Sequence, residues 1–420
     1  MNASASSAIR RSLARQENIL DGSIVLTPVD SFPLYDTAGP ELERLEGLYA
    51  TDRPREEAER LNSKIWFSGR QRMSHDIHCI YSAWADALGA AEMSMRLLSG
   101  LHAHVIIFMG LGTLGETVFL LPELAGGHFA TSGILKRLGY RVVDLPVDSN
   151  RLCVDMARAR ALVSQSEGGI LFIDRSEGLV YEDFSPLTEL PCLYCVYDAS
   201  QYLPAILTGR YSSPFAMGFD LLISTLHKSF PGPQKALVAT YCRNERWERV
   251  KQAMNQFVSS HHVRSTYLAG LGIEEGERLQ RYTQRLLANA VELEAALAAH
   301  GLPVVRRPVD QPPTQHLWLR FDNQESAYAA CRQLELCRIH TNYRLLPYGL
   351  GYGLRLGTTA ATLQGLSVQT VPELATLMCD ILSGGFTLRR RHAVRALALA
   401  MAQDNDLRPR RHRAPPPKHL

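Results

Sequence analysis

Lys228 stands where an apolar run stops. The segment "DLLISTLHKSFPGPQ", residues 220–234, is apolar for several residues and then changes to His-Lys and Pro-Gly-Pro. Ligands of open α/β sheets bind beyond the carboxyl ends of the strands, and we expect Lys228 at such an end. Partial desolvation there lowers the pKa of a lysine and frees the neutral amine for Schiff-base chemistry. On position alone, a surface lysine in a turn before Pro231 fits the segment equally well.

A carboxylate ends another strand-like run about thirty residues upstream. The segment "CVYDAS" places Asp198 at the end of an apolar strand. A carboxylate at that edge can hold a proton on the pyridine nitrogen of pyridoxal phosphate and so keep the ring an electron sink. Taken alone, Asp198 would more often be a helix cap. A strand ending in Asp198 followed by one ending before Lys228 favours a pyridoxal phosphate site.

Strand-like and helical patterns alternate from about residue 80 to 240, which predicts an α/β fold. Continuous apolar strands separated by helices indicate a mostly parallel sheet covered on both faces. The expected strands are "AHVIIFMGLG", "TVFLLPE", "YRVVDLPV", "GGILFID", "LYCVYDA" and "DLLIST", and the expected helices include "FATSGILKRLG" and "DMARARALVSQ".

The remainder of the chain predicts further units around this sheet. An amphipathic segment from Gly272 to Gly301 has the pattern of a helix that bridges domains, and a smaller α+β domain follows it. We predict an N-terminal arm (1–45) that packs on a partner chain, a large domain (46–275), a bridging helix with a small C-terminal domain (276–403), and a disordered basic, proline-rich tail (404–420).

Composition bounds the class of protein. The 420 residues are 46% hydrophobic with a net charge of +3, so no strong field predicts a nucleic acid or a membrane as partner. We find no run of about 18 apolar residues and no signal-peptide core, and we expect a cytoplasmic protein. Of the eight cysteines only Cys192 and Cys195 form a CxxC, inside an apolar strand-like run. We interpret them as buried structural thiols and predict no metal.

Four segments, in order, resemble serine hydroxymethyltransferases and the related threonine transaldolases. They are "RLLSGLHAH", "ELAGGHFATSG", "YDASQYLPAILTGRYSSPFAMGFDLLISTLHKSFPGPQ" and "GLRLGTTAAT", and the similarity covers about residues 45 to 390. The resemblance implies a fold type I transferase that depends on pyridoxal 5'-phosphate. It also implies a mostly parallel seven-stranded sheet in the large domain, a small α+β domain, and a homodimer.

The resemblance also implies roles for particular residues. Lys228 would form the internal aldimine, Asp198 would pair with the pyridine nitrogen, and His128 would stack on the ring, unless this imidazole merely caps the next helix. Arg355 would bind the substrate carboxylate, for which a planar guanidinium is suited. The remaining implied cofactor contacts are Tyr49, Ser99, Gly100, Leu101, Ser176, Gln201, Thr225 and His227, and Ser31 is a second implied substrate contact.

Departures from the family pattern bear on the reaction. Thr51 and Asp52 stand where hydroxymethyltransferases carry a glutamate for folate-dependent proton transfer, Gln201 replaces the usual histidine, and Leu101 replaces a hydroxyl residue. A neutral amide cannot shuttle a proton as imidazole can. The resemblance therefore favours folate-independent aldolase or transaldolase chemistry on a β-hydroxy L-α-amino acid, through a Cα carbanion, in specialised, antibiotic-type metabolism.

Other functions stay open at this point. A cyclase of the capreomycidine type would eliminate the β-hydroxyl of a hydroxyarginine and close a guanidino ring, and an acidic residue facing the substrate side chain would favour it. Asp30, Asp52 and Glu123 are the candidates. Serine hydroxymethyltransferase activity is a second alternative. A non-catalytic cofactor-binding protein is a third, although binding alone does not require Lys228.

Overall fold

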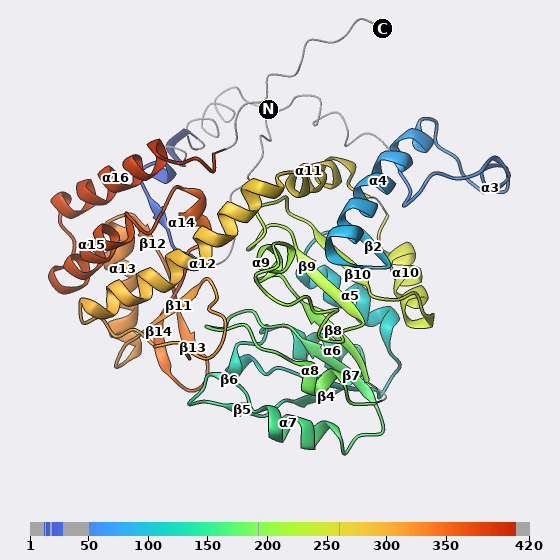
Figure 1. The fold of residues 1–420 in the computed structure, drawn as a ribbon, viewed down its shortest axis with the longest axis horizontal. Coiled ribbons are helices and arrows are strands. Elements are labelled where there is room, and N and C mark those ends of the chain that lie inside the picture. Colours follow the sequence, from blue (N-terminus) through green and yellow to red (C-terminus); the bar gives the residue numbers. More distant parts are fainter. Residues whose placement is uncertain are drawn as a thin grey trace, which may run out of the picture.

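A seven-stranded sheet forms the centre of the larger part of the molecule (Figure 1). The computed structural model describes residues 12, 14–16, 19–27, 50–191, 193–259 and 261–408. The sheet order is β2-β10-β9-β8-β7-β3-β4, and every neighbouring pair is parallel except the two that involve β10. The predicted α/β fold with a mostly parallel seven-stranded sheet is confirmed. The strands are β2 (Glu92–Leu97), β3 (Thr117–Leu120), β4 (Arg141–Asp144), β7 (Gly169–Ile173), β8 (Leu193–Asp198), β9 (Leu221–Thr225) and β10 (Ala236–Thr240).

Helices cover both faces of this sheet and bury its apolar side chains in two cores. One face carries α5 (Gly100–Leu111), α6 (Thr131–Arg137) and α10 (Glu245–Phe257). The other carries α4 (Arg70–Leu88), α7 (Met156–Val163), α8 (Ser185–Thr188), α9 (Leu203–Leu207) and α11 (Val263–Glu274). Both faces of the central strands are therefore dry, which explains their continuous apolar sequences.

One predicted strand is wrong. The run "AHVIIFMGLG" belongs to helix α5, not to a strand. Its residues are apolar on nearly all sides because α5 is sandwiched between the sheet and α10, so the helical period of polar residues is lost. Gly110 permits the close approach of α10, since a Cβ at that position would lie 2.6 Å from the carbonyl oxygen of Arg249.

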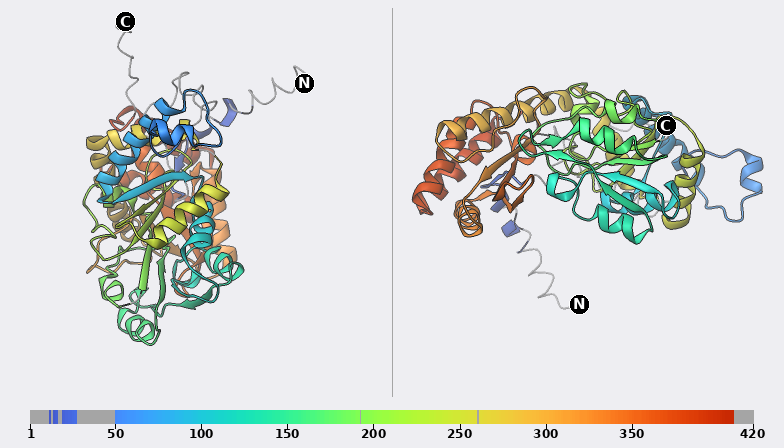
Figure 2. Two further views of the ribbon diagram at one scale, coloured as in Figure 1. Left: turned by 90° about the vertical axis from the view of Figure 1, so that its right-hand side faces the viewer. Right: turned by 90° about the horizontal axis from the view of Figure 1, so that it is seen from below.

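The C-terminal part is built around a three-stranded antiparallel sheet with the order β11-β14-β13. Helix α12 (Gly276–Ala299) runs from the large sheet to this part and packs against α15 (Figures 1 and 2). The elements are β11 (His316–Arg320), α13 (Gln324–Leu336), β13 (Asn342–Leu346), β14 (Gly351–Gly357), α14 (Thr359–Leu363), α15 (Val371–Gly384) and α16 (Leu388–Gln403). Short elements elsewhere are β1 (Ile24–Val25), α3 (Glu57–Leu61), η2 (Glu123–Ala125), β5 (Val147–Asp148), β6 (Cys153–Val154) and β12 (Ile339–His340).

Parts of the predicted terminal segments are described. Strand β1 pairs in parallel with β12 of the same chain, and Leu407 is buried. Of the predicted arm, the structure describes residues 12, 14–16 and 19–27. The other residues of the arm, and the tail from residue 409 on, lie outside the described residues. The three boundaries between the four predicted segments stay predictions.

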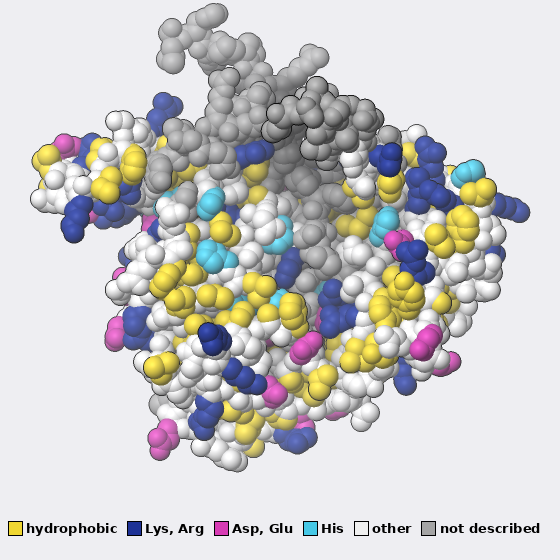
Figure 3. Space-filling model, turned by 180° about the vertical axis from the view of Figure 1, so that it is seen from behind, with side chains coloured by type: hydrophobic (Ala, Val, Ile, Leu, Met, Phe, Trp, Pro, Cys, Tyr) yellow, Lys and Arg dark blue, Asp and Glu magenta, His cyan; other side chains and the backbone are white. Residues whose placement is uncertain are grey.

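The described helices and the charges on one face of the molecule agree with the composition. None of the helices in the described ranges combines the length and the apolar character needed to cross a bilayer. Acidic and basic side chains are interspersed on the face shown in Figure 3, in keeping with the small net charge.

Candidate active site

Three neighbouring parallel strands end at one cavity. Asp174 follows β7, Asp198 is the last residue of β8, and Lys228 lies three residues beyond β9. The carboxyl ends of parallel neighbours lie at one edge of a sheet, which brings these chain positions together. The cavity has a volume of about 190 Å³. Its lining comprises Ser99, Gly100, Leu101, His104, His128, Asp174, Arg175, Ser176, Asp198, Ser200, Gln201, Thr225, His227 and Lys228.

Asp198 is buried and held by two hydrogen bonds. Its Oδ2 lies 2.7 Å from Nε2 of His104, and its Oδ1 accepts from the backbone N–H of Ser200 at 2.8 Å. Burial raises the pKa of Asp198, but the hydrogen bond and charge of His104 and the charge of Lys228 outweigh it and bring the pKa to about 2. The carboxylate is therefore ionised at neutral pH, as a partner for a protonated pyridine nitrogen must be.

Lys228 is half-buried and lines the same cavity as Asp198. The segment that carries it is tied to the segment after Asp198 on both sides. The backbone N–H of Thr225 donates to Oγ of Ser200 at 2.9 Å, and Oγ of Ser229 donates to the carbonyl oxygen of Ser200 at 2.9 Å. These bonds fix the lysine at the strand end and disfavour the alternative of a surface lysine in a turn.

His128 reaches the cavity because a glycine lets two loops meet. Gly126 has φ 90°, and a Cβ there would lie 2.1 Å from the carbonyl oxygen of Glu177. The backbone N–H of Ala130 donates to Nδ1 of His128 at 3.3 Å, so the imidazole also makes a local contact before α6. Burial, followed by the charges of His104 and Lys228, lowers the pKa of His128 to about 4. The ring is neutral at physiological pH.

The helix start at α5 is suited to a phosphate. Ser99 is the N-cap residue of this twelve-residue helix, and its Oγ accepts from the backbone N–H of His102 at 3.3 Å. Free backbone N–H groups in the first turn and the helix dipole attract an anion. Leu101, which lines the cavity with 40% of its surface exposed, offers no hydroxyl there. Phosphate contacts at this turn would therefore come from the backbone and Ser99.

The cavity fits pyridoxal phosphate in its donor and acceptor groups. An anion-binding helix start, an ionised carboxylate, a neutral imidazole and a lysine amine line one small space. Oγ1 of Thr225 is buried there and has no hydrogen-bond partner among the described residues, which leaves it available to a ligand. Ser176, Gln201 and His227, for which cofactor contacts were predicted, line the same space.

Arg355, the predicted substrate arginine, lies on β14 beside a protein carboxylate. Its Nη1 is 3.8 Å from Oε2 of Glu177, and Arg344 pairs with the other oxygen of that side chain. Burial lowers the pKa of Arg355 while Glu177 raises it. Arg355 does not line the 190 Å³ cavity, but Glu177 directly follows Ser176, which does. The role of Arg355 stays a prediction.

Gln201 is held by another amide. Nε2 of Gln315 donates to Oε1 of Gln201 at 3.0 Å and to its carbonyl oxygen at 2.9 Å. Neither side chain titrates, so this corner of the cavity cannot exchange protons with a substrate.

Two of the three acidic residues considered for facing a substrate side chain, Asp52 and Glu123, do not line the cavity. Glu123 is exposed on η2 and does not line the cavity. Asp52 lines a separate, larger cavity, and its Oδ1 is 3.5 Å from Nε2 of His261. Asp30 lies outside the described residues, as do two other predicted site residues, Ser31 and Tyr49.

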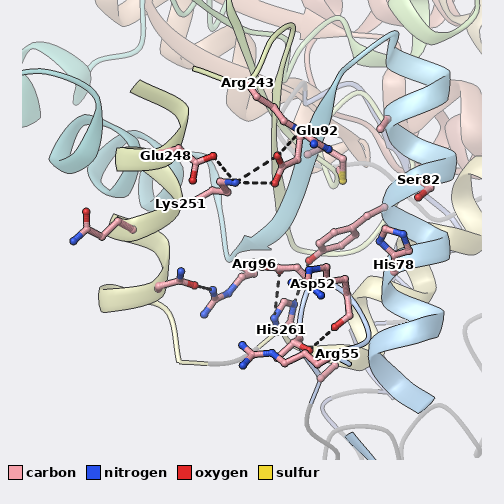
Figure 4. Close-up of a pocket in the computed structure, with 18 of the residues that line it drawn as sticks. Asp52, Arg55, His78, Ser82, Glu92, Arg96, Arg243, Glu248, Lys251 and His261 are labelled. Atoms are coloured by element: carbon pink, nitrogen blue, oxygen red, sulfur yellow. Dashed lines mark hydrogen bonds and ion pairs between the residues drawn. The ribbon is translucent and has the colours of Figure 1, made fainter. Parts of the chain in front are cut away.

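The larger cavity, of about 960 Å³, lies between α4, β2 and α10 (Figure 4). Some of its charged groups pair with one another, as Lys251 does with Glu92 at 3.2 Å and with Glu248 at 2.8 Å, whereas Arg96 donates to the neutral Asn255 and to a carbonyl oxygen. Because Lys228 does not line this larger cavity and lines the smaller one, we take the smaller cavity as the candidate active site.

Sequence reasoning missed four residues of the site: His104, Asp174, Arg175 and Ser200. Asp174 could have been found, since it follows an apolar strand as directly as Asp198 ends one. His104 lies four residues after Gly100, one helical turn further on the same face of α5. It could have been assigned to the site only if the segment had been predicted as a helix.

The described residues offer neither a second site built on cysteines nor a metal site. Cys195 is buried in β8, where burial and then the charge of Asp220 raise its pKa to about 12. Cys192 lies outside the described residues. The described residues contain no group of three or more His, Cys, Asp or Glu side chains arranged to hold a metal ion.

Comparison with known proteins identifies the class. No family model matches the chain. An L-threonine:uridine-5'-aldehyde transaldolase from Streptomyces sp is 30% identical over 295 residues, 68% of this chain and 71% of that protein. A serine hydroxymethyltransferase from Pyrobaculum arsenaticum is 26% identical over 349 residues, 81% of each chain. The crystal structure of L-threonine transaldolase from Pseudomonas fluorescens in the internal aldimine state superposes with a TM-score of 0.86, covering 96% of this chain and 92% of that one at 20% identity, which shows the shared fold.

Fold and site together define an enzyme of fold type I whose cofactor is pyridoxal phosphate. The chain belongs to the family that comprises serine hydroxymethyltransferases and threonine transaldolases. It is therefore a transferase or lyase of this family, and the relatives support aldolase-type chemistry on a β-hydroxy amino acid.

Proposed function

We propose that this enzyme cleaves an L-threonine-like β-hydroxy amino acid between Cα and Cβ and transfers the glycyl unit to a second aldehyde, without folate. The similarity to a transaldolase from Streptomyces supports this reaction and a place in specialised metabolism. The observation that carries the choice within the family is Gln201, whose amide is locked to Gln315 where an imidazole would serve proton transfer.

The residues of the cavity would divide the work as follows. Lys228 would bind the aldehyde carbon of the cofactor, and Ser99 with the α5 start would hold its phosphate. The bound cofactor supplies an electron sink for a carbanion at Cα. Asp198, ionised and buried, would hold the proton on the ring nitrogen, and neutral His128 would lie against the ring without repelling that positive charge.

Substrate binding would use the arginine beside the cavity. Arg355 can bind an α-carboxylate with two parallel hydrogen bonds once Glu177 gives way, because the two carboxylates compete for one guanidinium.

A second copy of the chain would complete the site. Apolar side chains at the cavity and directly after His128 are exposed in the single chain: Leu101 by 40% and Phe129 by 68%. Exposed apolar groups gathered at one place favour contact with another protein surface. We therefore propose a homodimer. The cyclase alternative stays a prediction, and Asp52 and Glu123 do not line the cavity.

The test compares substrates on the purified holoenzyme. L-Threonine, L-serine and 3-hydroxyarginine are incubated separately, with and without an added aldehyde acceptor and with and without tetrahydrofolate, using Lys228→Ala as the blank. We expect acetaldehyde from threonine and a new β-hydroxy amino acid when the acceptor is present, independent of folate. Folate-dependent cleavage of serine, or water loss from hydroxyarginine without acetaldehyde from threonine, would refute the proposal.

A further inference from the structure

A chain of four buried polar groups connects three residues that line the cavity, Asp198, His104 and Asp174, through Thr131, which does not line it. Nε2 of His104 lies 2.7 Å from Oδ2 of Asp198, and Nδ1 of His104 lies 3.3 Å from Oγ1 of Thr131. The Thr131 hydroxyl in turn contacts Oδ2 of Asp174. The exposed fraction of all four residues is between 0% and 8%, so their hydrogen bonds are made to one another rather than to bulk water.

These contacts come from four separate elements. His104 lies on α5, Thr131 opens α6, Asp174 follows β7, and Asp198 ends β8. Phe172 packs edge-on against the imidazole at 5.1 Å between ring centroids, and His128 does so at 5.9 Å. The ring of His104 is thus held in one orientation by its packing as well as by its hydrogen bonds.

We propose that His104 is a positioning residue for Asp198 and that Asp174, through Thr131, shares a proton with its imidazole. The proposal rests on the proposed function in one respect, namely that Asp198 is the partner of the cofactor ring. None of the four residues except Asp198 was expected from the sequence to take part.

Counting protons shows why the chain can work in this way. Three contacts need three protons, and two arrangements supply them. In the first, Asp174 is protonated and donates to Thr131, Thr131 donates to Nδ1 of His104, and Nε2–H donates to Asp198. In the second, both nitrogens of His104 carry protons, Nδ1–H donates to Thr131, and Thr131 donates to ionised Asp174.

Both arrangements have a net charge of −1. The second is reached from the first when one proton moves from Asp174 to Thr131 and another moves from Thr131 to Nδ1 of His104. In both, Asp198 stays ionised and accepts from His104. Burial, together with the negative charge of Asp198, raises the pKa of Asp174 well above its usual range, which favours the first arrangement, whereas the charge of His104 that helps to lower the pKa of Asp198 belongs to the second. The charged groups that face the chain are Lys228 and, when protonated, His128. The chain thus keeps one negative charge in place at the end of β8.

Three variants separate this role from simple packing. His104→Ala removes the donor to Asp198, His104→Gln restores a single N–H donor, and Thr131→Val breaks the chain on the far side of the imidazole without touching Asp198. His75→Gln, on the exposed side of α4, is the matched control for the same substitution.

The first readout is the exchange of the Cα hydrogen of glycine with D₂O by the holoenzyme. Loss of a hydrogen bond to a charged group corresponds to a roughly 10- to 100-fold slower rate, which we expect for His104→Ala. His104→Gln should recover part of the loss, and His75→Gln should equal the wild type. If His104 contributes only to packing, His104→Ala and His104→Gln would lower thermal stability, but the exchange rate for each molecule of folded holoenzyme would equal that of the wild type.

The second readout is the ¹⁵N NMR spectrum of His104 in the holoenzyme without substrate. We expect a protonated Nε2 in the wild type and in Thr131→Val, with a shifted Nδ1 resonance in the variant. An unprotonated Nε2, or an unchanged exchange rate in His104→Ala, would overturn the proposal. If His104→Ala does not fold, the ¹⁵N spectra of the wild type and of Thr131→Val still test the proposal. No acceptor aldehyde is used, so a failed transaldolase assay leaves this test valid.

Discussion

Replacing Asp198 by asparagine should remove a pH-dependent contribution to the stability of the apoprotein. The pKa of this carboxyl falls from its ordinary value of 3.8 to about 2 in the folded chain. At 1.36 kcal/mol for each tenfold change in affinity for a proton, that difference is worth roughly 2 to 3 kcal/mol. A group with a depressed folded pKa stabilises the protein above its unfolded pKa and loses the contribution as the pH falls towards the folded value.

The assay is urea unfolding of apoprotein between pH 7 and pH 3. We expect Asp198→Asn to be less stable than the wild type by roughly 2 to 3 kcal/mol at pH 7, and about half of that gap to close by pH 3. Asp86→Asn, an exposed position on α4, is the control and should leave the free energy of unfolding unchanged. An Asp198→Asn gap that stays constant over this range would refute the reasoning that His104 and Lys228 hold the carboxylate ionised.

The remaining predictions concern the groups around the cavity. Arg355→Ala should weaken binding of L-threonine by roughly 2 to 5 kcal/mol, measured as a rise in KM, and an unchanged KM would exclude it as the carboxylate ligand. Glu177→Gln should lower the KM for L-threonine, because it removes the carboxylate that competes for Arg355; a raised KM would contradict that competition. Gly126→Ala should cost at least roughly 1 to 3 kcal/mol in urea unfolding, since φ is 90° and a Cβ would lie 2.1 Å from a carbonyl oxygen. Gly133→Ala, which meets no atom within 4 Å, is its control.

The sequence predicted those parts of the fold in which local pattern and burial agree. The runs that became β3, β4, β7, β8 and β9 are short, apolar and bounded by turn residues, and parallel strands buried on both faces have this pattern. Helix α5 was mistaken for a strand because a helix buried on nearly all sides has no polar period. Strands β2 and β10 were missed, and the antiparallel pairing of β10 with its two neighbours could not be predicted because strand direction depends on long-range pairing, which no local pattern records.

The residues of the site also divide into those that a local sequence pattern predicts and those that depend on contacts between distant segments. Lys228 and Asp198 could be predicted because each follows an apolar strand, and the structure brings them to one cavity. The contact between Arg355 and Glu177 could not, since it joins β14 to the loop after β7, 178 residues away in sequence. Nor could the hydrogen bond of His104 to Asp198, which depends on α5 packing against the sheet in one register.

The central claim is that the amine of Lys228 binds the aldehyde of pyridoxal phosphate beside Asp198. The most direct test is to treat the holoenzyme with borohydride, digest it, and locate the modified residue by mass spectrometry. We predict a single phosphopyridoxyl group on Lys228, with loss of the visible absorption of the cofactor. Modification at another lysine, or none with absorption unchanged, would contradict the account.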